Sequence, residues 1–313
     1  MVKQMERYSG TNMKDLIFVI ESPNPGSCKV KGMQPAEHFN VECLVSSDMN
    51  YTRYRDTIMV FIGSVSMGHK LNKEKIEALQ SKGNIILNDP VDAYCYFNPW
   101  GDNPGTSEVE YLCATVIDGI FTPNTEALKN LKSIVKKECF LQNMPHNLDK
   151  HFFDIPQEKN DFFSIGYGGH PYPNEFFNDK PVPYLEMITT GHNDNVLKFC
   201  KQHTCHFSHR KSNTLDFMMK PASKVVVASV CKSPIVTSRD WSVMDLLPKD
   251  YPLLVGDDRL DVVKKIEYAK GIYGTKEWND LLDIADGIKE KTSLDYQQKD
   301  YFKVFNHFGW REK

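Results

Sequence analysis

Residues 205–236, which read CHFSHRKSNTLDFMMKPASKVVVASVCKSPIV, decide the fold. The apolar run at 205–208 predicts a buried strand, and a polar loop that carries Arg210 follows it. The apolar residues after Pro221 predict a helix, because proline suits the first helical turn, where its missing N–H has no partner to lose. Residues 234–237 predict a second strand. This strand–loop–helix–strand order is typical of a parallel sheet with helices on its faces.

The same alternation extends in both directions along the chain. Helical spacing of apolar residues predicts a helix at 73–79, which stops at Gly83, and the region 261–308 is helical in pattern. Nearly continuous apolar strands between helices favour parallel sheets that are covered on both faces. The further strands predicted in this way are 15–20, 57–62, 84–87, 119–121, 162–167, 184–188 and 252–255.

The length of 313 residues exceeds what one compact core usually holds, so we expect two domains. The polar, proline-broken stretch 155–160 reads as the linker between them. The fold class is therefore predicted to be α/β, with two doubly wound, Rossmann-like domains at residues 1–157 and 158–290. Such domains bind ligands at the carboxyl ends of their strands, in a cleft that we expect between the two.

Composition and charge exclude several classes of protein. The formal net charge is −3, whereas a protein held on nucleic acid by its whole surface is normally basic. No apolar run approaches the ~20 residues that cross a bilayer, and residues 1–7 lack the apolar stretch of a secretion signal, so we expect a cytoplasmic protein. The eight cysteines form no CxxC pair and are expected to be reduced core thiols.

A site for a diphosphate is predicted at the start of the helix that follows Pro221. Unpaired backbone N–H groups and the helix dipole favour anions there. Lys220, Ser223 and Lys224 cluster at this point, and Arg210 lies just upstream. The alternative interpretation is an ordinary capped surface helix whose lysines are solvated.

This block resembles the donor-binding part of nucleotide-sugar-dependent glycosyltransferases of the GT-B architecture. The resemblance implies two Rossmann-like domains facing across a cleft, with the acceptor on the first, a nucleotide diphosphate sugar on the second, and a carboxyl-terminal helix, residues 291–313, returning to the first. It implies no other cofactor. The residues that carry it are Lys220-Pro221-x-x-Lys224, Ala228, Pro234-Ile235-Val236, residues 238–247 and Gly166-Tyr167-Gly168-Gly169-His170.

The resemblance also suggests roles for individual residues beside the donor. Many retaining members carry two glutamates that bracket the start of this helix, and here those positions hold Lys220 and Val227, so retaining and inverting transfer both stay open. Lys220 instead supplies a cation for the leaving diphosphate. The residues expected to line the cleft around donor and acceptor are Gly168, Gly169, His170, His209 and Arg239, with His170 a candidate catalytic residue.

The first domain holds further candidates. Gly26 and Ser27 follow the first strand and, by the resemblance, approach the diphosphate from the other side, although a proline-fixed turn is the alternative. Asp89 and Asp92 follow the strand at 84–87, where a carboxylate can act as the general base of an inverting transfer or can simply cap a helix. The aromatic cluster at 94–101 either stacks on sugars or bases or packs under a loop.

No metal site is predicted, because the histidines show no ligand spacing and Asp89-Pro90-Val91-Asp92 is one residue too long for a DxD motif. The leading hypothesis is a metal-independent hexosyl- or pentosyltransferase that acts on a glycan precursor. One alternative is a phage-type transferase for a hydroxymethylated base in DNA, working in the host cytoplasm. The other alternative is a nucleotide-sugar-binding protein without catalysis. The DNA hypothesis needs a local basic patch, for which Lys129, Lys132, Lys136 and Lys137 are the candidates.

Overall fold

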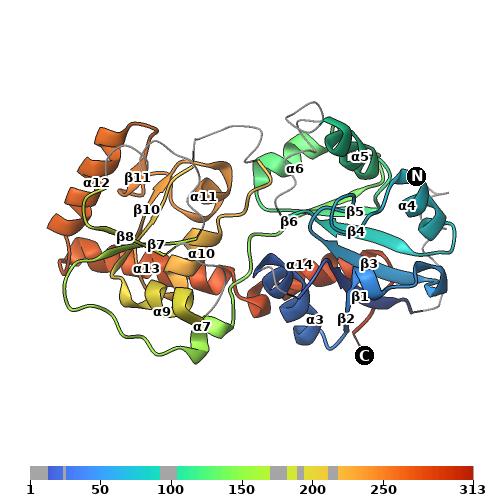
Figure 1. The fold of residues 1–313 in the computed structure, drawn as a ribbon, viewed down its shortest axis with the longest axis horizontal. Coiled ribbons are helices and arrows are strands. Elements are labelled where there is room, and N and C mark those ends of the chain that lie inside the picture. Colours follow the sequence, from blue (N-terminus) through green and yellow to red (C-terminus); the bar gives the residue numbers. More distant parts are fainter. Residues whose placement is uncertain are drawn as a thin grey trace. The chain divides into compact units, whose positions relative to one another are not determined.

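The computed structural model describes residues 13–23, 26–91, 104–169, 182–188, 194–210 and 218–312. The chain forms two compact α/β units, which Figure 1 colours along the sequence. The first unit comprises Met1–Pro145, Leu215–Pro221 and Leu294–Lys313. The second comprises His146–Thr214 and Ala222–Ser293.

A six-stranded parallel sheet in the order β2-β1-β3-β4-β5-β6 forms the centre of the first unit. Strands β1 and β3 have the bounds predicted from their apolar runs, and both are almost wholly buried. The strands are β1 (Asp15–Ile20), β2 (Glu42–Val45), β3 (Thr57–Ile62), β4 (Ile85–Asp89), β5 (Gly119–Thr122) and β6 (Phe140–Asn143).

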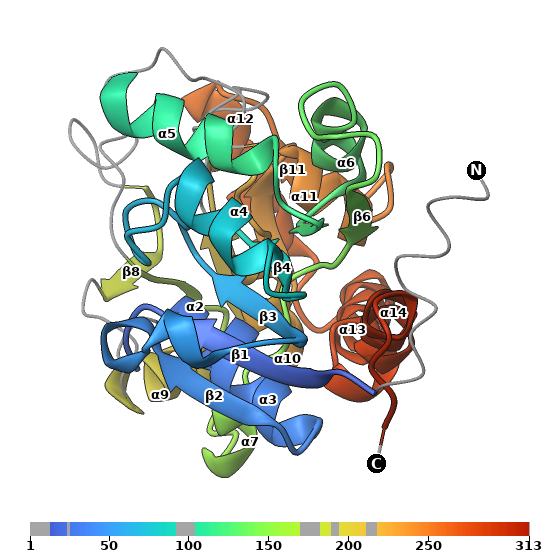
Figure 2. The same cartoon turned by 90° about the vertical axis from the view of Figure 1, so that its right-hand side faces the viewer.

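Helices cover both faces of this sheet, and Figure 2 shows α4 and α5 on one side of the strands and α14 on the other. Alternate strand residues point to opposite faces, so one face of β1 presents Phe18 and Ile20 to the core that α14 completes. The helical elements are α2 (Gly26–Cys28), the π-helical turn η1 (Lys29–Met33), α3 (Gln34–His38), the 3₁₀ turns η2 (Ser46–Asp48) and η3 (Tyr51–Arg53), α4 (Lys73–Gln80), α5 (Pro104–Ala114), α6 (Thr125–Leu131) and α14 (Leu294–His307).

The predicted return of the carboxyl-terminal helix to the first unit is confirmed. Phe305 of α14 meets the ring of Phe18 edge-on, with 6.2 Å between the ring centroids. Tyr301 packs in the same way against Phe39, at 5.2 Å, and both α14 aromatics are buried. The sequence that ends the chain therefore completes the core that the first strands begin.

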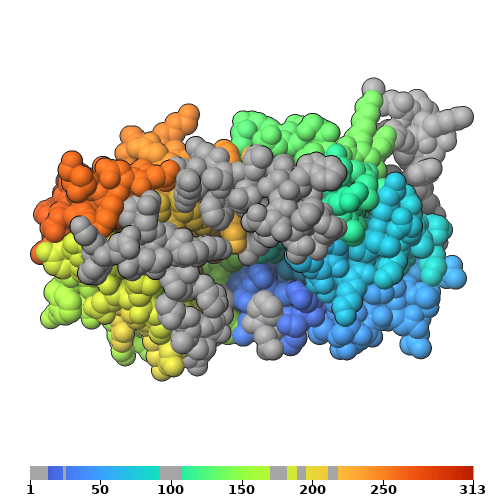
Figure 3. Space-filling view, turned by 45° about the horizontal axis from the view of Figure 1, so that its top comes forward, coloured from blue at the N-terminus to red at the C-terminus, as the bar shows by residue number. Residues whose placement is uncertain are grey.

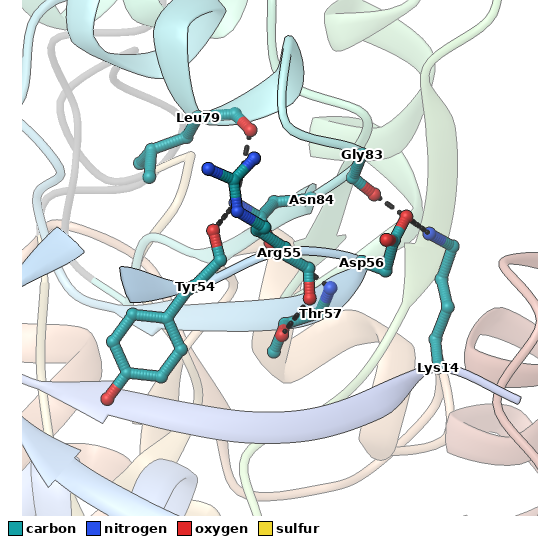
Figure 4. A network of polar contacts seen from close by, with 8 residues as sticks. All are labelled: Lys14, Tyr54, Arg55, Asp56, Thr57, Leu79, Gly83 and Asn84. Atoms are coloured by element: carbon teal, nitrogen blue, oxygen red, sulfur yellow. Dashed lines mark hydrogen bonds and ion pairs between the residues drawn. The ribbon is translucent and has the colours of Figure 1, made fainter. Parts of the chain in front are cut away.

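Polar contacts fasten the amino-terminal edge of this sheet (Figure 4). Asn84, just before β4, accepts a hydrogen bond from the Thr57 amide at 3.1 Å and donates to the carbonyls of Tyr54 and Leu79. Lys14, just before β1, donates to the Gly83 carbonyl at 2.8 Å. These bonds satisfy backbone groups beside the starts of β3 and β4. Doubly wound sheets bind their ligands at the opposite, carboxyl-terminal edge.

The second unit has a five-stranded parallel sheet in the order β11-β10-β9-β7-β8. Its helix α12 is partly exposed, with Leu260 at 62%, and contributes to the orange surface in Figure 3. The strands are β7 (Ile165–Gly168), β8 (Leu185–Ile188), β9 (Cys205–Ser208), β10 (Ile235–Ser238) and β11 (Leu254–Val255). The helices are α7 (His151–Asp154), α9 (Asp194–Gln202), α10 (Ser223–Val230), α11 (Trp241–Leu246), α12 (Arg259–Gly271) and α13 (Lys276–Lys291).

The stretch read as a linker, residues 155–160, lies on the second unit. Gln157 donates to the Lys201 carbonyl at 2.8 Å, and the Asn160 amide donates to the Gln202 carbonyl at 2.8 Å. The chain changes unit earlier, after Pro145. Phe152 explains the difference, because it is buried in a cluster with residues of α9 and α10 and carries the intervening chain into the second unit.

Candidate functional site

Each sheet has one topological switch point, where the chain leaves two neighbouring strands in opposite directions. In the first unit this point lies between β1, which leads to β2, and β3, which leads to β4. In the second it lies between β7, which leads to β8, and β9, which leads to β10. We call them the first and second switch points. Ligands of doubly wound sheets bind outside the carboxyl ends of the strands at such points.

Lys224, the second residue of α10, lies at the second switch point. Its ammonium group donates to the carbonyl of Gly168, the last residue of β7, and stands 5.4 Å from the centroid of the Tyr167 ring. Burial lowers the pKa of Lys224, the Arg210 charge lowers it further, and the Cys200 thiol opposes both. Gly168, Lys224 and Arg210, all predicted from the sequence, are therefore brought together.

Arg210 follows β9 on the other side of the same switch point. Its guanidinium lies 3.6 Å from Asp240, and its backbone amide donates to the Ser238 hydroxyl at 2.9 Å. Asp240 in turn caps α11 by accepting from the Val243 amide at 3.0 Å. Burial raises the pKa of Asp240, while Arg210 and the amides of Val243 and Ser242 lower it. The strand ends β9 and β10 thus hold the guanidinium in one place.

The remaining residues predicted around the donor take different positions. His209 donates to the Gly256 carbonyl at 3.2 Å and lies 3.7 Å from Asp257, so its ring turns toward the end of β11. Gly169 has φ +147°, a conformation that requires glycine. Arg239 is exposed after β10.

The start of α10 differs in one detail from its prediction. The helix begins at Ser223, and Ala222 is its N-cap, with no side-chain cap bond. Pro221 therefore precedes the cap instead of lying in the first turn. Lys220 is half-buried in the segment that belongs to the first unit. The Val225 and Val226 amides donate to the Ala222 carbonyl, at 3.0 and 3.2 Å, so the amides of Ser223 and Lys224 are the ones that need acceptors from outside the helix, which suits an anion.

One strand beyond the first switch point, Asp89 closes β4 and is buried in an ion pair with Lys31, at 3.1 Å. Lys31 also donates to the carbonyls of Met144 and Pro145, at 3.4 and 3.1 Å. Asp89 thus joins the end of β4 to the end of β6. Gly26 and Ser27 open α2 and are half-buried.

Two further carboxylates in this region were not singled out from the sequence. Glu110 of α5 is wholly buried and accepts from the amides of Val65 and Ser66, at 3.0 and 2.8 Å, and from the Ser64 hydroxyl, at 2.8 Å. Glu21 follows β1 and is exposed. The rule that selected Asp89, an acid directly after a buried strand, applies equally to Glu21.

Several predicted residues lie outside the described residues: Asp92, His170 and the aromatic cluster at 94–101. Within the described ranges, no group of three or more histidines, cysteines or acids is arranged to hold a metal ion. Among the helices in those ranges, none combines the length and apolar character that crossing a bilayer requires.

Comparison with known proteins gives matches in fold. No family model and no curated protein matches the sequence. A sucrose-phosphate synthase from Thermosynechococcus elongatus has a TM-score of 0.62 and 10% identity, covering 94% of this chain and 98% of its own. HepE from Anabaena, in complex with UDP and glucose, has a TM-score of 0.63 and 9% identity, and the match covers 94% of this chain and 99% of HepE. AviGT4, a glycosyltransferase involved in avilamycin A biosynthesis, has a TM-score of 0.53 and 13% identity, covering 95% and 99%.

At these identities the likeness establishes the fold. The chain has the two-unit α/β fold of GT-B glycosyltransferases, as the resemblance of residues 205–236 predicted. The roles of individual residues stay predictions.

Proposed function

We propose that the protein is a glycosyltransferase that moves a sugar from a nucleotide diphosphate sugar to an acceptor hydroxyl. The observation that carries this proposal is the pair of cations, Lys224 and Arg210, fixed at the switch point of the second sheet. Negative charge develops on the diphosphate as it leaves the sugar, and preorganised cations and N–H groups stabilise that charge. Lys220 and Ser223 would add donors at the same helix start.

Lys224 is suited to this role although it already bonds to Gly168. An ammonium group has three N–H donors, and the contact with the Gly168 carbonyl uses one of them. That contact fixes the nitrogen against the end of β7, so little side-chain freedom remains to be lost when an anion binds. No metal ion is required in this scheme, because the cations neutralise the leaving group.

The first candidate for the nucleotide is uridine diphosphate. HepE, one of the structures with this fold, was solved with UDP, with UDP and glucose, and with UDP-glucose. We therefore propose UDP-sugars as the donors to test first and a glycan precursor as the acceptor.

The DNA alternative has less support from the surface. Two of the four lysines of the expected basic patch have acidic partners: Lys136 lies 2.8 Å from Asp118, and Lys129 lies 3.2 Å from Glu126. Paired lysines contribute less to a field that attracts phosphates, since the acid cancels their charge.

A thermal-shift screen tests the proposal. UDP, UDP-glucose and the corresponding adenosine and guanosine compounds are added to the full chain, and a ligand that binds the folded state raises its Tm. The Tm rise is expected to shrink in Lys224→Met and to persist in Lys198→Met, which removes an exposed lysine from α9 of the same unit. A Tm that no nucleotide moves would refute the donor site.

A turnover assay distinguishes an enzyme from the alternative, a nucleotide-sugar-binding protein without catalysis. With the donor found in the screen, an enzyme releases nucleoside diphosphate when candidate glycans are added, whereas a binding protein keeps its ligand intact.

A further inference from the structure

A cavity of about 430 Å³ lies at the amino-terminal edge of the first sheet, the edge opposite the first switch point. Small-molecule sites in proteins commonly have volumes of about 300–1,000 Å³, so this space is large enough for a small ligand. Its walls come from the starts of β1, β2 and β3, the end of α3 and the residues after α14. All of these belong to the first unit, which therefore forms the cavity by itself.

The strand register explains why the sheet is open here. Glu42, the first residue of β2, pairs with Ile17, the third residue of β1. Asp15 and Leu16 thus extend past the start of β2, while on their other side they pair with the first residues of β3. The cavity occupies this step in the edge of the sheet.

Two aromatic side chains form a fixed apolar wall of the cavity. Phe39 and Trp310 are buried, with exposures of 8% and 5%. The Trp310 ring packs against Phe302 and Phe305, with ring centroids 5.5 and 5.8 Å apart. Phe39 packs against Phe302 as well, at 5.6 Å. Because these rings hold one another in place, a ligand would lose little free energy in ordering them.

The charged side chains of the lining are acidic. Asp15, Glu42 and Glu312 are exposed there, and among the described residues no lysine or arginine lines the cavity. Tyr54 adds a half-buried ring to the lining. Burial raises the pKa of Tyr54 and the nearby Glu42 charge raises it further, whereas the Arg53 charge lowers it. The phenol thus lies in the field of a carboxylate.

The basic residues that neighbour these acids in the chain bind elsewhere. Lys14, which precedes Asp15, donates to the Gly83 carbonyl at 2.8 Å (Figure 4). Arg311 donates to backbone carbonyls at the end of α14 and just after it. His38, which does line the cavity, donates to a glutamine of α14 at 3.1 Å. The three carboxylates therefore give the cavity a negative potential, which attracts cations.

The arrangement of these acids favours an organic cation over a metal ion. Within the described ranges, no group of three or more acids, histidines or cysteines has the geometry to hold a metal. An ammonium group on an apolar body would use both features of the cavity. Its charge would meet the carboxylates and the face of the Tyr54 ring, and its body would pack on the wall of Phe39 and Trp310.

We propose that this cavity binds a small organic cation that carries a primary ammonium group on an apolar body. The site lies wholly within the first unit, so it is independent of the proposed donor site and of the glycosyltransferase function. Titration calorimetry on the full chain, without nucleotide, tests the proposal. Benzylammonium is the probe, and benzyl alcohol, which has nearly the same shape and no charge, is its matched control.

Benzylammonium is expected to bind at one site at least about fivefold more tightly than benzyl alcohol, because an ion pair at 4 Å in water contributes about a factor of five. Its affinity should fall as sodium chloride is added, since salt screens exposed charges. Equal affinities for the two probes, or no binding of benzylammonium at millimolar concentration, would overturn the proposal.

Variants locate the binding in this cavity. Glu42→Gln should weaken benzylammonium about fivefold and leave the affinity for benzyl alcohol unchanged. Tyr54→Leu should weaken benzylammonium as well, because it keeps an apolar side chain and removes the aromatic face. Glu74→Gln is the matched control, since Glu74 is an exposed glutamate of α4 that does not line the cavity. Wild-type affinity in Glu42→Gln, or an equal loss in Glu74→Gln, would exclude this cavity as the site.

Discussion

The two switch points share one backbone arrangement and differ in charge. At the second, Lys224 and Arg210 present cations from α10 and the end of β9. At the first, the cation Lys31 is buried against Asp89, and the exposed group is the carboxylate of Glu21. Doubly wound sheets bind ligands at such points, and the side chains of the loops decide which ligand each point could take.

The buried ion pairs near the two switch points also differ in the elements that they connect. Lys31–Asp89 connects the ends of β4 and β6 within the first sheet. Arg210–Asp240 connects the end of β9 to the cap of α11 and holds a guanidinium whose charge lowers the pKa of Lys224. One pair is a structural crosslink, and the other orients a guanidinium that we propose binds the donor diphosphate.

Removing the crosslink should produce the largest effect. Asp89→Asn leaves Lys31 buried without its counter-charge, so we expect the free energy of unfolding to fall by about 3–5 kcal/mol. Urea denaturation measures the change. The double variant Lys31→Met, Asp89→Asn should recover part of the loss, because no charge is then stranded. A stable Asp89→Asn protein that has lost turnover would instead make Asp89 the general base, as the sequence suggested.

Removing the functional cation should affect turnover next most strongly. Lys224→Ala is expected to lower the transfer or hydrolysis rate by about a hundredfold, which corresponds to roughly 2.7 kcal/mol, because one preorganised donor to the leaving diphosphate is lost. The contact with Gly168 is lost as well, so a modest fall in Tm accompanies it. Steady-state kinetics with UDP-glucose check this. Unchanged kinetics would show that the charge of Lys224 does not act on the leaving diphosphate, and the contrast in charge between the switch points would then have no functional meaning.

Acid should destabilise the second unit through His206 of β9. Burial lowers the pKa of His206 to about 3, and the charges of His203, Lys159 and Lys224 act in the same direction. The unfolded chain binds this proton near pH 6.5, so stability is lost as the pH falls from 6.5 toward 3, by about 1.4 kcal/mol per pH unit.

His206→Gln tests that dependence with the fold preserved. Its amide nitrogen can replace the ring nitrogen that donates to the Cys200 carbonyl at 3.0 Å. We expect a flatter pH dependence of the denaturation midpoint in this variant. An equal slope in the two proteins would exclude His206 as the source.

The smallest effect is expected from metal removal. If cations of the second switch point replace a metal ion, a chelator should leave the rate of UDP release unchanged. Loss of activity in a chelator and its return with magnesium or manganese would contradict this and would shift the neutralising role away from Lys224 and Arg210.

Local sequence was sufficient for most elements. Strands β1, β3 and β9 have the predicted bounds, because short apolar runs between polar loops admit few other buried structures. The cluster of Lys224 with Arg210 was also predictable, since both flank one strand–loop–helix unit. The supposed linker was not, because its polar residues find backbone partners on α9 that no local pattern reveals.

By itself, the sequence determined two parallel α/β sheets and the basic start of α10, because each depends on contacts between neighbours in the chain or on regular periodicity. The return of the last helix was expected from the resemblance alone, since it rests on contacts between distant residues such as Phe18 and Phe305. Only the tertiary structure decided which acid is available at the first switch point. Asp89 and Glu21 both follow buried strands and look alike in the sequence. Lys31 of η1 holds Asp89 in a buried ion pair, whereas Glu21 is exposed.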